Sequence, residues 1–425
     1  MNEKKLAQSP GLFTFVIVAP ALWAILGLVV FIEKYLLRWP KPLWYPFFSD
    51  TSYTDFTIFQ PQFAAFGTPQ FWQPHGFPFT YPASAALAFE AFFSIPGGSH
   101  LQYFLLFIAA SAVIAAIASG VALRRRGLEF DSALLLAGIA LLSSYPFMFL
   151  FDRGNIEIVN WIFVSFAITA YWCERWKLAG ALLGIAISLK IFPVVLLGLF
   201  LARKKYAAML IAVGTAVGVD VASLALLGPT IKIAHQQISH GLRFFRDLYV
   251  YEFHFWEVPF DHSLFAVVKR IASVVHLADQ AHLAIFARWY MPIVAAGALL
   301  IYFGRIIRLP RINQIVILLT LSILLPPVSG DYTLVHLYPG WLLLSFFAIE
   351  VETGVIRSRV LPACFFLLAF VFCPETYIVA GHHAHIAGSL KAVALSALVI
   401  LLLVYPLEER SEDLGGNRSD HRRCA

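Results

Sequence analysis

The sequence predicts an all-α, polytopic integral membrane protein, and three observations support this fold class. Of the 425 residues, 60% are hydrophobic and 13% are charged, whereas a soluble domain is usually about half apolar and about a quarter charged. Apolar runs recur along the chain, and each has about the 20 residues needed to cross roughly 30 Å of hydrocarbon. The short alternating segments typical of a membrane β-barrel are absent from the sequence.

The distribution of basic residues indicates membrane topology and argues against nucleic-acid binding. The net charge is +6, but Lys and Arg occur in short clusters between apolar runs. Such clusters mark the cytoplasmic ends of membrane spans. We therefore expect a multi-pass protein of the plasma (inner) membrane, in contact with membrane lipid and without a nucleic-acid partner.

The first part of the chain is expected to contain two spans separated by a long external loop. The start, MNEKK, places the N-terminus in the cytoplasm, and the first span covers about residues 11–33. This apolar run is longer than the h-region of about 7–15 residues in a signal peptide, so we expect an uncleaved anchor. A Pro- and Trp-rich loop follows at about 34–98, and the run at 100–123 returns to three arginines at 124–126.

The next segments are expected to end in a re-entrant hairpin. Residues 131–151 leave the cytoplasm and residues 156–173 return. Basic residues flank the segment 178–205 on both sides, so both of its ends are expected to be cytoplasmic. Lys190 and Pro193 then lie at the break of a hairpin. Non-helical backbone inside the membrane is tolerated only where protein surrounds it or where it lines a water-filled cavity. We therefore expect Lys190 to line a cavity.

The remaining apolar runs complete the bundle. They cover 206–227, 285–304, 313–328, a segment ending near 348, 361–380 and a last run to 404, with a second external loop at about 228–282. Ten crossings and one re-entrant pair account for every basic cluster, which predicts about 10–12 transmembrane or re-entrant helices. We expect residues 1–407 to form one transmembrane domain and residues 408–425 a disordered cytoplasmic tail.

Polar residues that topology does not explain fall mostly in the external segments, which suggests a site on that face. The first loop contains Asp50 and Asp55 among aromatic and hydroxyl side chains. A carboxylate in a partly apolar pocket can act as a general base toward a hydroxyl group. The same two residues can also be a loop cap and a solvated turn residue, and composition alone favours that interpretation.

Two further segments allow more than one interpretation. The second loop, HQQISHGLRFFRDLYVYEFHFWEVPFDHSL, is rich in aromatic and charged groups. It suits either sugar binding or a helix lying among lipid headgroups. HHAH at 382–385 resembles a metal cluster, but no paired carboxylate lies near it in the sequence, so we expect no metal site.

A series of motifs resembles the polyprenyl-phosphate-dependent mannosyltransferases of glycosyltransferase family 87, within the GT-C membrane superfamily. The motifs are, in order, YTDFTIFQPQFAAFGTPQF, FPFTYPAS, DRGNIEIVNW, WKLAGALLGIAISLKIFPVVLLGLFLARKK, FDHSLFAVVKR and PPVSGDYTLVHLYP. Each motif is weak alone, but their order and spacing together cover most of the chain. Ala83 stands where the family often has a second Pro, and His336 alone stands near the place of a His pair.

The resemblance implies a GT-C-like helical bundle with two long extracytoplasmic loops and an inverting sugar transfer. The donor would be a polyprenyl-phosphate sugar whose lipid chain lies in an apolar groove between helices. A base in the first loop would deprotonate a hydroxyl of a lipid or glycan acceptor, and cationic groups would stabilise the departing phosphate. By its position in the family motif, Asp55 would be the base, and Asp50 would be the second candidate for that role. The sugar implied is a hexose, mannose by family, with no metal and no cofactor.

The resemblance also implies a set of residues that bind donor or acceptor. Arg153 and Asn155 would face the cavity from the outer end of the third span. The other candidates are Tyr81, His262, His336 and Lys190. We expect Lys190 to lie toward the cytoplasmic half of the bundle, which favours a structural role for it.

An alternative function remains open, because a transporter or flippase of lipid-linked or polar solutes is also polytopic. Such a protein would place ionisable groups near the bilayer midplane on broken helices. Lys190 fits that pattern, and Asp220 is an isolated acid within a span. The sequence has no clear internal repeat, which weakens the hypothesis of a transporter built from two symmetric halves.

Overall fold

The computed structural model of the protein describes residues 9–31, 52–72, 77–254, 258–352, 360–373 and 387–407. Three sequence predictions fall outside these ranges and stay predictions. They concern the rival base Asp50, the HHAH segment at 382–385 and the tail at 408–425.

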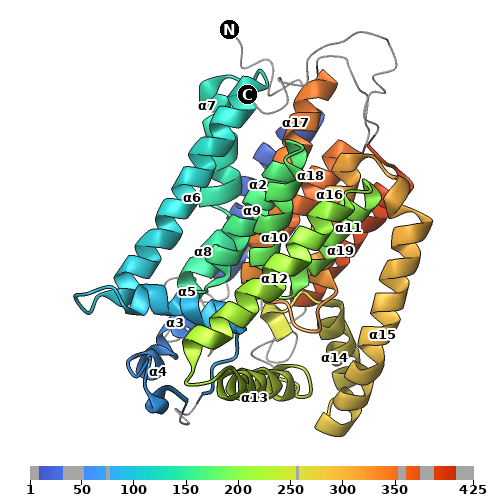
Figure 1. Cartoon of the computed structure of the whole chain (residues 1–425). Helices are drawn as coiled ribbons and strands as arrows, with labels where there is room; N and C mark the ends of the chain where they lie inside the picture. Colours follow the sequence, from blue (N-terminus) through green and yellow to red (C-terminus); the bar gives the residue numbers. More distant parts are fainter. Residues whose placement is uncertain are drawn as a thin grey trace.

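The described residues form helices almost throughout, which confirms the predicted all-α class (Figure 1). Among them, the only isolated β-bridge pairs Asp261 with Gly330. The elements in chain order are α2 (Pro10–Phe31), α3 (Thr54–Thr57), α4 (Gln60–Phe63), η2 (Pro69–Trp72), α5 (Ala83–Phe93), α6 (His100–Arg125), α7 (Phe130–Ala137), η3 (Gly138–Leu142), α8 (Tyr145–Arg153), α9 (Glu157–Trp172), α10 (Trp176–Leu189), η4 (Phe192–Leu196), α11 (Leu197–Ala202), α12 (Tyr206–Leu227), α13 (Ile231–Tyr249), η5 (Val258–Phe260), α14 (Leu264–Val274), α15 (Gln280–Gly304), η6 (Ile306–Arg308), α16 (Arg311–Leu324), η7 (Asp331–Leu337), α17 (Tyr338–Glu352), α18 (Leu361–Val371) and α19 (Ala387–Val404).

Several of these helices have the character of membrane spans. Within the described ranges, four helices are long and apolar enough to cross a bilayer: His100–Arg125, Tyr206–Leu227, Gln280–Arg308 and Asp331–Glu350. A fifth results if Phe130–Leu142 and Tyr145–Arg153, bent by 44° at their junction, count as one span. Eight further apolar helices have 10–17 residues. The protein is therefore a multi-pass helical membrane protein, and the crossing count of the sequence prediction stays a prediction.

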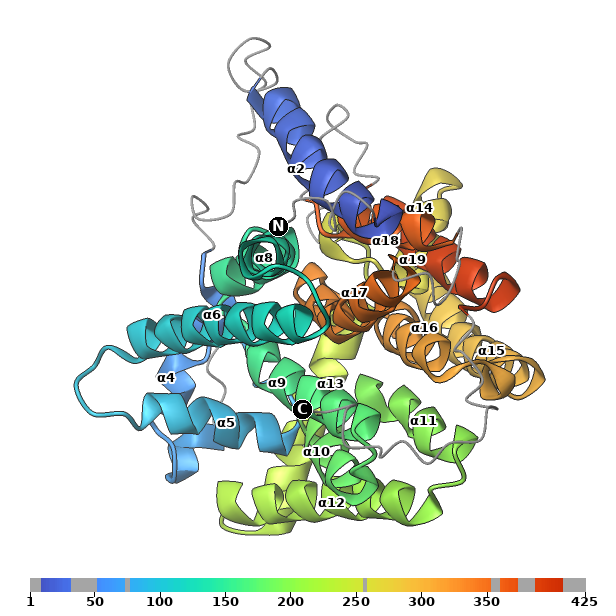
Figure 2. The ribbon, with the colours of Figure 1, turned by 90° about the horizontal axis from the view of Figure 1, so that it is seen from above.

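The longest apolar helices line the periphery of the bundle. Leu106 on α6 is 66% exposed, Leu210 on α12 is 68% exposed and Leu300 on α15 is 75% exposed. Seen from above, α6, α12 and α15 lie on the outside, with α9 and α17 between them (Figure 2). Lipid tails are as apolar as leucine, so these outward faces suit contact with a bilayer.

The predicted hairpin is present. α10 ends at Leu189, and the chain continues through η4 into α11, with Lys190 and Pro193 at the break. The Nζ atom of Lys205, which follows α11, lies 4.9 Å from the ring centroid of Trp176 at the start of α10. The hairpin therefore returns to the end of the bundle from which it started.

The segments predicted as long polar loops contain helices of their own. The first includes α3, α4, η2 and the apolar helix α5, and the second includes α13 and α14. α13 lies across the lower end of the upright helices (Figure 1). A Cβ atom on Gly241 of α13 would lie 1.8 Å from the carbonyl oxygen of Phe79. The absence of a side chain at Gly241 therefore allows the two loop segments to pack directly against each other.

Candidate functional site

Asp55 is held in place by the short helix α3. The backbone N–H of Tyr53 donates to the carbonyl oxygen of Asp152 at 2.6 Å, and the Ser52 hydroxyl donates to the carboxylate of Asp152 at 2.7 Å. On the other side of α3, the Phe56 ring stacks on Phe93 and on Phe104, each with a centroid distance of 4.5 Å. These contacts fasten α3 between the end of α8 and the start of α6.

The DRGN motif is the turn between α8 and α9. Gly154 ends α8 in the left-handed conformation, with φ 60° and ψ 46°. The N–H of Asn155 then donates to the carbonyl oxygen of Leu150 at 3.2 Å, as in a Schellman C-cap. The Asn155 side chain in turn accepts the N–H of Glu157 at 2.9 Å and so caps the start of α9. The turn therefore places two donors, Arg153 and Asn155, beside α3.

Both of these donors engage Asp55. Arg153 Nη2 lies 2.5 Å from Asp55 Oδ1, and Asn155 Nδ2 lies 2.7 Å from Asp55 Oδ2. The side chain of Asp55 keeps 17% of its surface exposed. A carboxylate has about four lone-pair sites, so these two bonds leave room for a substrate hydroxyl. The structure therefore brings together the predicted base and two of the predicted binding residues.

Tyr81 extends this group. Asn155 Nδ2 also donates to the Tyr81 hydroxyl at 3.3 Å, and the rings of Phe59, Phe79 and Phe89 surround the Tyr81 ring. Burial, together with the negative charge of Asp55, raises the pKa of the Tyr81 hydroxyl well above its ordinary value. The phenol therefore stays protonated near neutral pH and remains able to donate a hydrogen bond.

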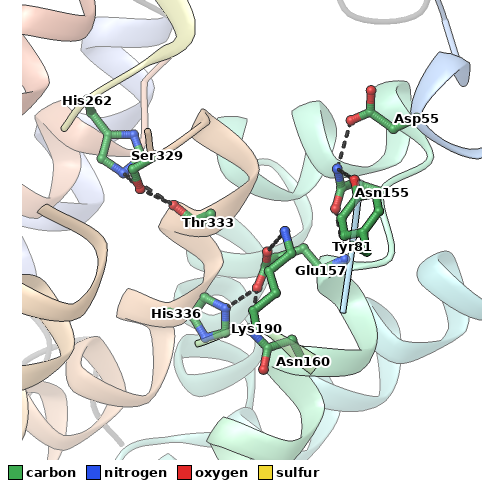
Figure 3. A network of polar contacts seen from close by, with 10 residues as sticks. All are labelled: Asp55, Tyr81, Asn155, Glu157, Asn160, Lys190, His262, Ser329, Thr333 and His336. Carbon is green, nitrogen blue, oxygen red and sulfur yellow. Dashed lines mark hydrogen bonds and ion pairs between the residues drawn. The ribbon is translucent and has the colours of Figure 1, made fainter. Parts of the chain in front are cut away.

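Glu157 is the centre of the network, and the sequence prediction missed it (Figure 3). Its side chain is fully buried. Oε1 accepts from Asn160 Nδ2 and His336 Nε2, each at 2.7 Å, and Oε2 accepts from Lys190 Nζ at 2.5 Å. An acid in the apolar run after DRGN was the available signal, because ionisable residues within spans are usually functional.

Lys190 lies beside Tyr81 and Glu157, whereas the expectation that it lies toward the cytoplasmic half stays a prediction. Its Nζ atom is 5.2 Å from the ring centroid of Tyr81 and 4.9 Å from that of Tyr332. Its backbone is extended, with φ −152° and ψ 136°, because α10 ends there. The hydroxyl of Ser84, from the first loop segment, donates to the carbonyl oxygen of Ser188 at 2.6 Å and satisfies this helix end.

His336 and His262, which were predicted to share a role, occupy different surroundings. His336 joins the Asp55 network through Glu157. The His262 ring is buried, with Nδ1 3.2 Å from Asp331 Oδ1 and Nε2 3.1 Å from the Ser329 hydroxyl. Figure 3 shows the two rings in separate groups. The 3-10 helix η7 carries both Asp331 and His336 and connects the groups.

Asp331 anchors the second group. Besides His262, it accepts from Lys391 Nζ at 2.6 Å and from the Tyr145 hydroxyl at 2.8 Å, and all of these side chains are buried. Both ring nitrogens of His262 face protein groups, so His262, Asp331 and Lys391 form a buried polar group that fixes the start of η7.

An apolar cavity of about 490 Å³ lies among α2, η3, α8 and α18. Its lining residues are Phe15, Ala19, Pro20, Trp23, Ile139, Leu142, Ser143, Ser144, Met148 and Phe372. Trp23 packs against Tyr145 and Phe149, and the Phe149 ring stacks on Tyr332 with a centroid distance of 6.3 Å. Aromatic contacts thus connect this cavity with Tyr332, whose ring lies next to the Lys190 ammonium group.

Among the described residues, no group of three or more His, Cys, Asp or Glu side chains is placed to hold a metal ion. The chemistry available at the site is that of a carboxylate with free lone pairs, next to guanidinium and ammonium groups. Such an arrangement can accept a proton from a hydroxyl and stabilise an anionic leaving group.

Comparison with known proteins identifies relatives for part of the chain. The model of glycosyltransferase family 87 matches residues 79–327, which is more than half of the sequence. The polyprenol-phosphate-mannose-dependent alpha-(1-2)-phosphatidylinositol pentamannoside mannosyltransferase of Mycolicibacterium smegmatis is 31% identical over 135 residues. This match spans 31% of the present chain and 31% of that protein. No solved structure matches significantly.

Proposed function

This chain belongs to glycosyltransferase family 87, and we propose that it is a membrane hexosyltransferase that uses a polyprenyl-phosphate sugar. The donor sugar is a hexose, with mannose as the first choice because the relative is named as polyprenol-phosphate-mannose-dependent. The acceptor is a hydroxyl group of a lipid or glycan. The donor acts as a substrate, and the proposal includes no cofactor.

One observation carries the proposal: Asp55 is held by Arg153 and Asn155 within the same network as Lys190. A single-displacement transfer needs a base for the acceptor and cations for the leaving phosphate, but no second catalytic carboxylate. The site offers one partly exposed acid and two cationic side chains, which matches these needs.

The proposed reaction proceeds in one displacement. Asp55 accepts the proton of the acceptor hydroxyl as its oxygen forms a bond to the anomeric carbon of the donor. The bond between that carbon and the phosphate oxygen breaks, and the polyprenyl phosphate leaves with the electron pair. Arg153 and Lys190 stabilise the negative charge that develops on the phosphate. Attack opposite the leaving group inverts the configuration.

The cavity among α2, α8 and α18 supports the lipid part of the proposal. Its wall is mostly apolar, which suits an isoprenoid chain. Its aromatic neighbours lead toward Tyr332 and Lys190. We place the polyprenyl tail of the donor there, with the phosphate near Lys190.

We propose that the active site is extracytoplasmic. Phe56, next to Asp55, stacks on Phe104 at the start of α6, while Arg124 and Arg125 lie at the end of this 26-residue helix. A rise of about 1.5 Å per residue separates the two ends by roughly 40 Å. Basic clusters prefer the cytoplasmic side, so the end with Asp55 faces outward.

A transporter or flippase remains the second candidate, because Lys190 and Glu157 form an ion pair at a broken hairpin. Such pairs mark pathways for ions and solutes in transporters. This candidate predicts movement of solute without formation of a glycosidic bond.

A transfer assay distinguishes the two candidates. The purified full chain in proteoliposomes is incubated with polyprenyl-phosphate mannose, glucose or arabinose, each radiolabelled, and a total membrane lipid extract as acceptor. We expect label from the mannose donor in a new product. Solute uptake with no sugar transfer from any donor would instead establish the transporter.

A further inference from the structure

Glu157 joins three parts of the chain through one buried carboxylate. Asn160 lies one turn further along α9, Lys190 follows α10, and His336 belongs to η7. Both oxygens are engaged, and the side chain has no exposed surface. A carboxylate buried in this way cannot contact a substrate in this arrangement. The Glu157 carboxylate can therefore affect the reaction only through the side chains that it binds, which are Asn160, Lys190 and His336.

The backbone of Glu157 also contributes to the site. Its N–H donates to Asn155 Oδ1 at 2.9 Å, which orients the Asn155 amide so that Nδ2 points to Asp55 at 2.7 Å. One residue thus links the proposed base on one side with Lys190 on the other. The side-chain and backbone roles can be separated experimentally, because a substitution at Glu157 keeps the backbone N–H.

Two polar groups held by Glu157 have capacity left for a ligand. The Nδ1 atom of His336 is buried and has no hydrogen-bond partner in the described part of the protein. An ammonium group has three N–H donors, and Lys190 Nζ makes one hydrogen bond among the described residues, to Glu157. A buried polar atom without a partner costs free energy, so a group that binds there would relieve that cost.

We propose that Glu157 is a positioning residue that holds Lys190 and His336 around the phosphate of the lipid-linked donor. This inference rests on the proposed function and adds a residue to it. The negative charge of Glu157 compensates the ammonium group where water is mostly excluded, since the Lys190 side chain is only 15% exposed. Oε1 binds His336 and Oε2 binds Lys190, so both side chains are fixed on one carboxylate, and the N–H groups of Lys190 that Glu157 does not bind are available to the phosphate.

The main test is Glu157→Gln, which keeps the size of the side chain but removes its charge. Initial rates are measured with polyprenyl-phosphate mannose varied at a fixed acceptor concentration, and then with the acceptor varied. We expect the KM for the donor to rise about 10- to 100-fold, as a lost charge-assisted hydrogen bond predicts. The KM for the acceptor should change little, and Glu157→Asp should recover part of the donor affinity.

Glu350→Gln is the matched control. Glu350 also pairs with a cation, Arg126, at 2.9 Å, but Arg126 directly follows α6 at the basic end of the bundle. This substitution should leave both KM values unchanged. An equal rise in donor KM in the control, an unchanged donor KM in Glu157→Gln, or tighter donor binding in Glu157→Gln would overturn the proposal.

A double-mutant cycle separates positioning from a purely structural role, and it remains informative if Glu157→Gln alone folds poorly. Lys190→Gln is compared with the pair Lys190→Gln and Glu157→Gln, which removes both charges together. If Glu157 acts on the phosphate through Lys190, its substitution should add less than about threefold to the donor KM of Lys190→Gln. Independent, fully additive effects would contradict the proposal.

Binding of polyprenyl phosphate, without sugar, distinguishes failure of this inference from failure of the proposed function. The Kd is measured on the detergent-solubilised full chain for wild type and Glu157→Gln. Weaker binding by the variant supports the phosphate site even if no sugar transfer is found. Equal binding, with transfer intact in the wild type, overturns the inference alone. Absence of binding to the wild type overturns both.

Discussion

At the scale of single residues, Asp55 is placed to accept a proton because its two donors, both from one turn, leave lone pairs of the carboxylate unused. Arg153 and Asn155 are separated by one residue at the end of α8, and each takes one oxygen of the carboxylate. Phe56 is fixed in an aromatic stack beside them. The remaining lone pairs of Asp55 are left for an acceptor hydroxyl, which links the local geometry to the proposed reaction.

We expect Asp55→Asn to lower the rate of sugar transfer by about 10²–10⁴-fold, the usual contribution of general acid–base catalysis. The amide keeps the size of the side chain but cannot take a proton from the acceptor. The rate is measured by the radiolabel assay, and the elution volume of the purified protein checks its fold. Asp247→Asn is the matched control, since Asp247 is about half exposed on α13 and pairs with its neighbour Arg246. Full activity in Asp55→Asn would exclude Asp55 as the base.

At the scale of elements, the junction of α8 and α9 decides whether the site forms. Gly154 has φ 60°, and a Cβ atom there would lie 3.3 Å from Phe56 Cβ. The same junction supplies Arg153, Asn155 and Glu157 to the network. A short turn between two apolar helices therefore places the base, its donors and the residue that holds Lys190.

We expect Gly154→Ala to lower the free energy of unfolding by about 1–2 kcal/mol, the cost of the left-handed conformation for a residue with a Cβ atom. Transfer activity should fall as well, because the turn positions Asn155. Thermal unfolding in detergent and the transfer assay measure the two effects. Gly138→Ala is the control, since Gly138 has φ −63° and open space around its Cβ position. Equal stability of the two variants would show that the turn tolerates a side chain.

At the scale of the whole molecule, the bundle separates a basic end from the end that carries the site. The re-entrant hairpin begins and ends at the basic end, and its break carries Lys190 to the Glu157 network. At the other end, α13 and the first loop segment pack together through Gly241 and Phe79. This division is the structural basis for the proposed sidedness.

Thiol labelling tests the sidedness in intact cells. The four native cysteines are replaced by serine, and one new cysteine is introduced at Thr68 or at Arg125, both of which are exposed. We expect a membrane-impermeant maleimide to label Thr68→Cys from outside, and Arg125→Cys only after the membrane is permeabilised. The reverse pattern would place Asp55 on the cytoplasmic side and contradict the proposed topology.

The sequence predicted the helical elements better than the membership of the site. The all-α class and the break at Lys190 follow from apolar runs and flanking charges, which are local properties. Asp55, Arg153, Asn155 and Tyr81 were selected through motifs, and the structure does bring them together. Lys190 was also selected as a candidate, but its contacts with Tyr81 and Glu157 could not be derived from the sequence, because residues on different helices meet only through tertiary packing.

Length, hydrophobicity and charge along the chain were enough to determine a multi-pass helical protein. The free-energy cost of exposing an apolar group to water, or of placing a charge in hydrocarbon, belongs to each residue separately and can be summed along the sequence. Tertiary structure alone decided that Glu157 binds His336, 179 residues away in the chain, and that His262 turns to Asp331 instead. A buried charge requires a partner in space, and the way the helices pack determines which distant residue provides it.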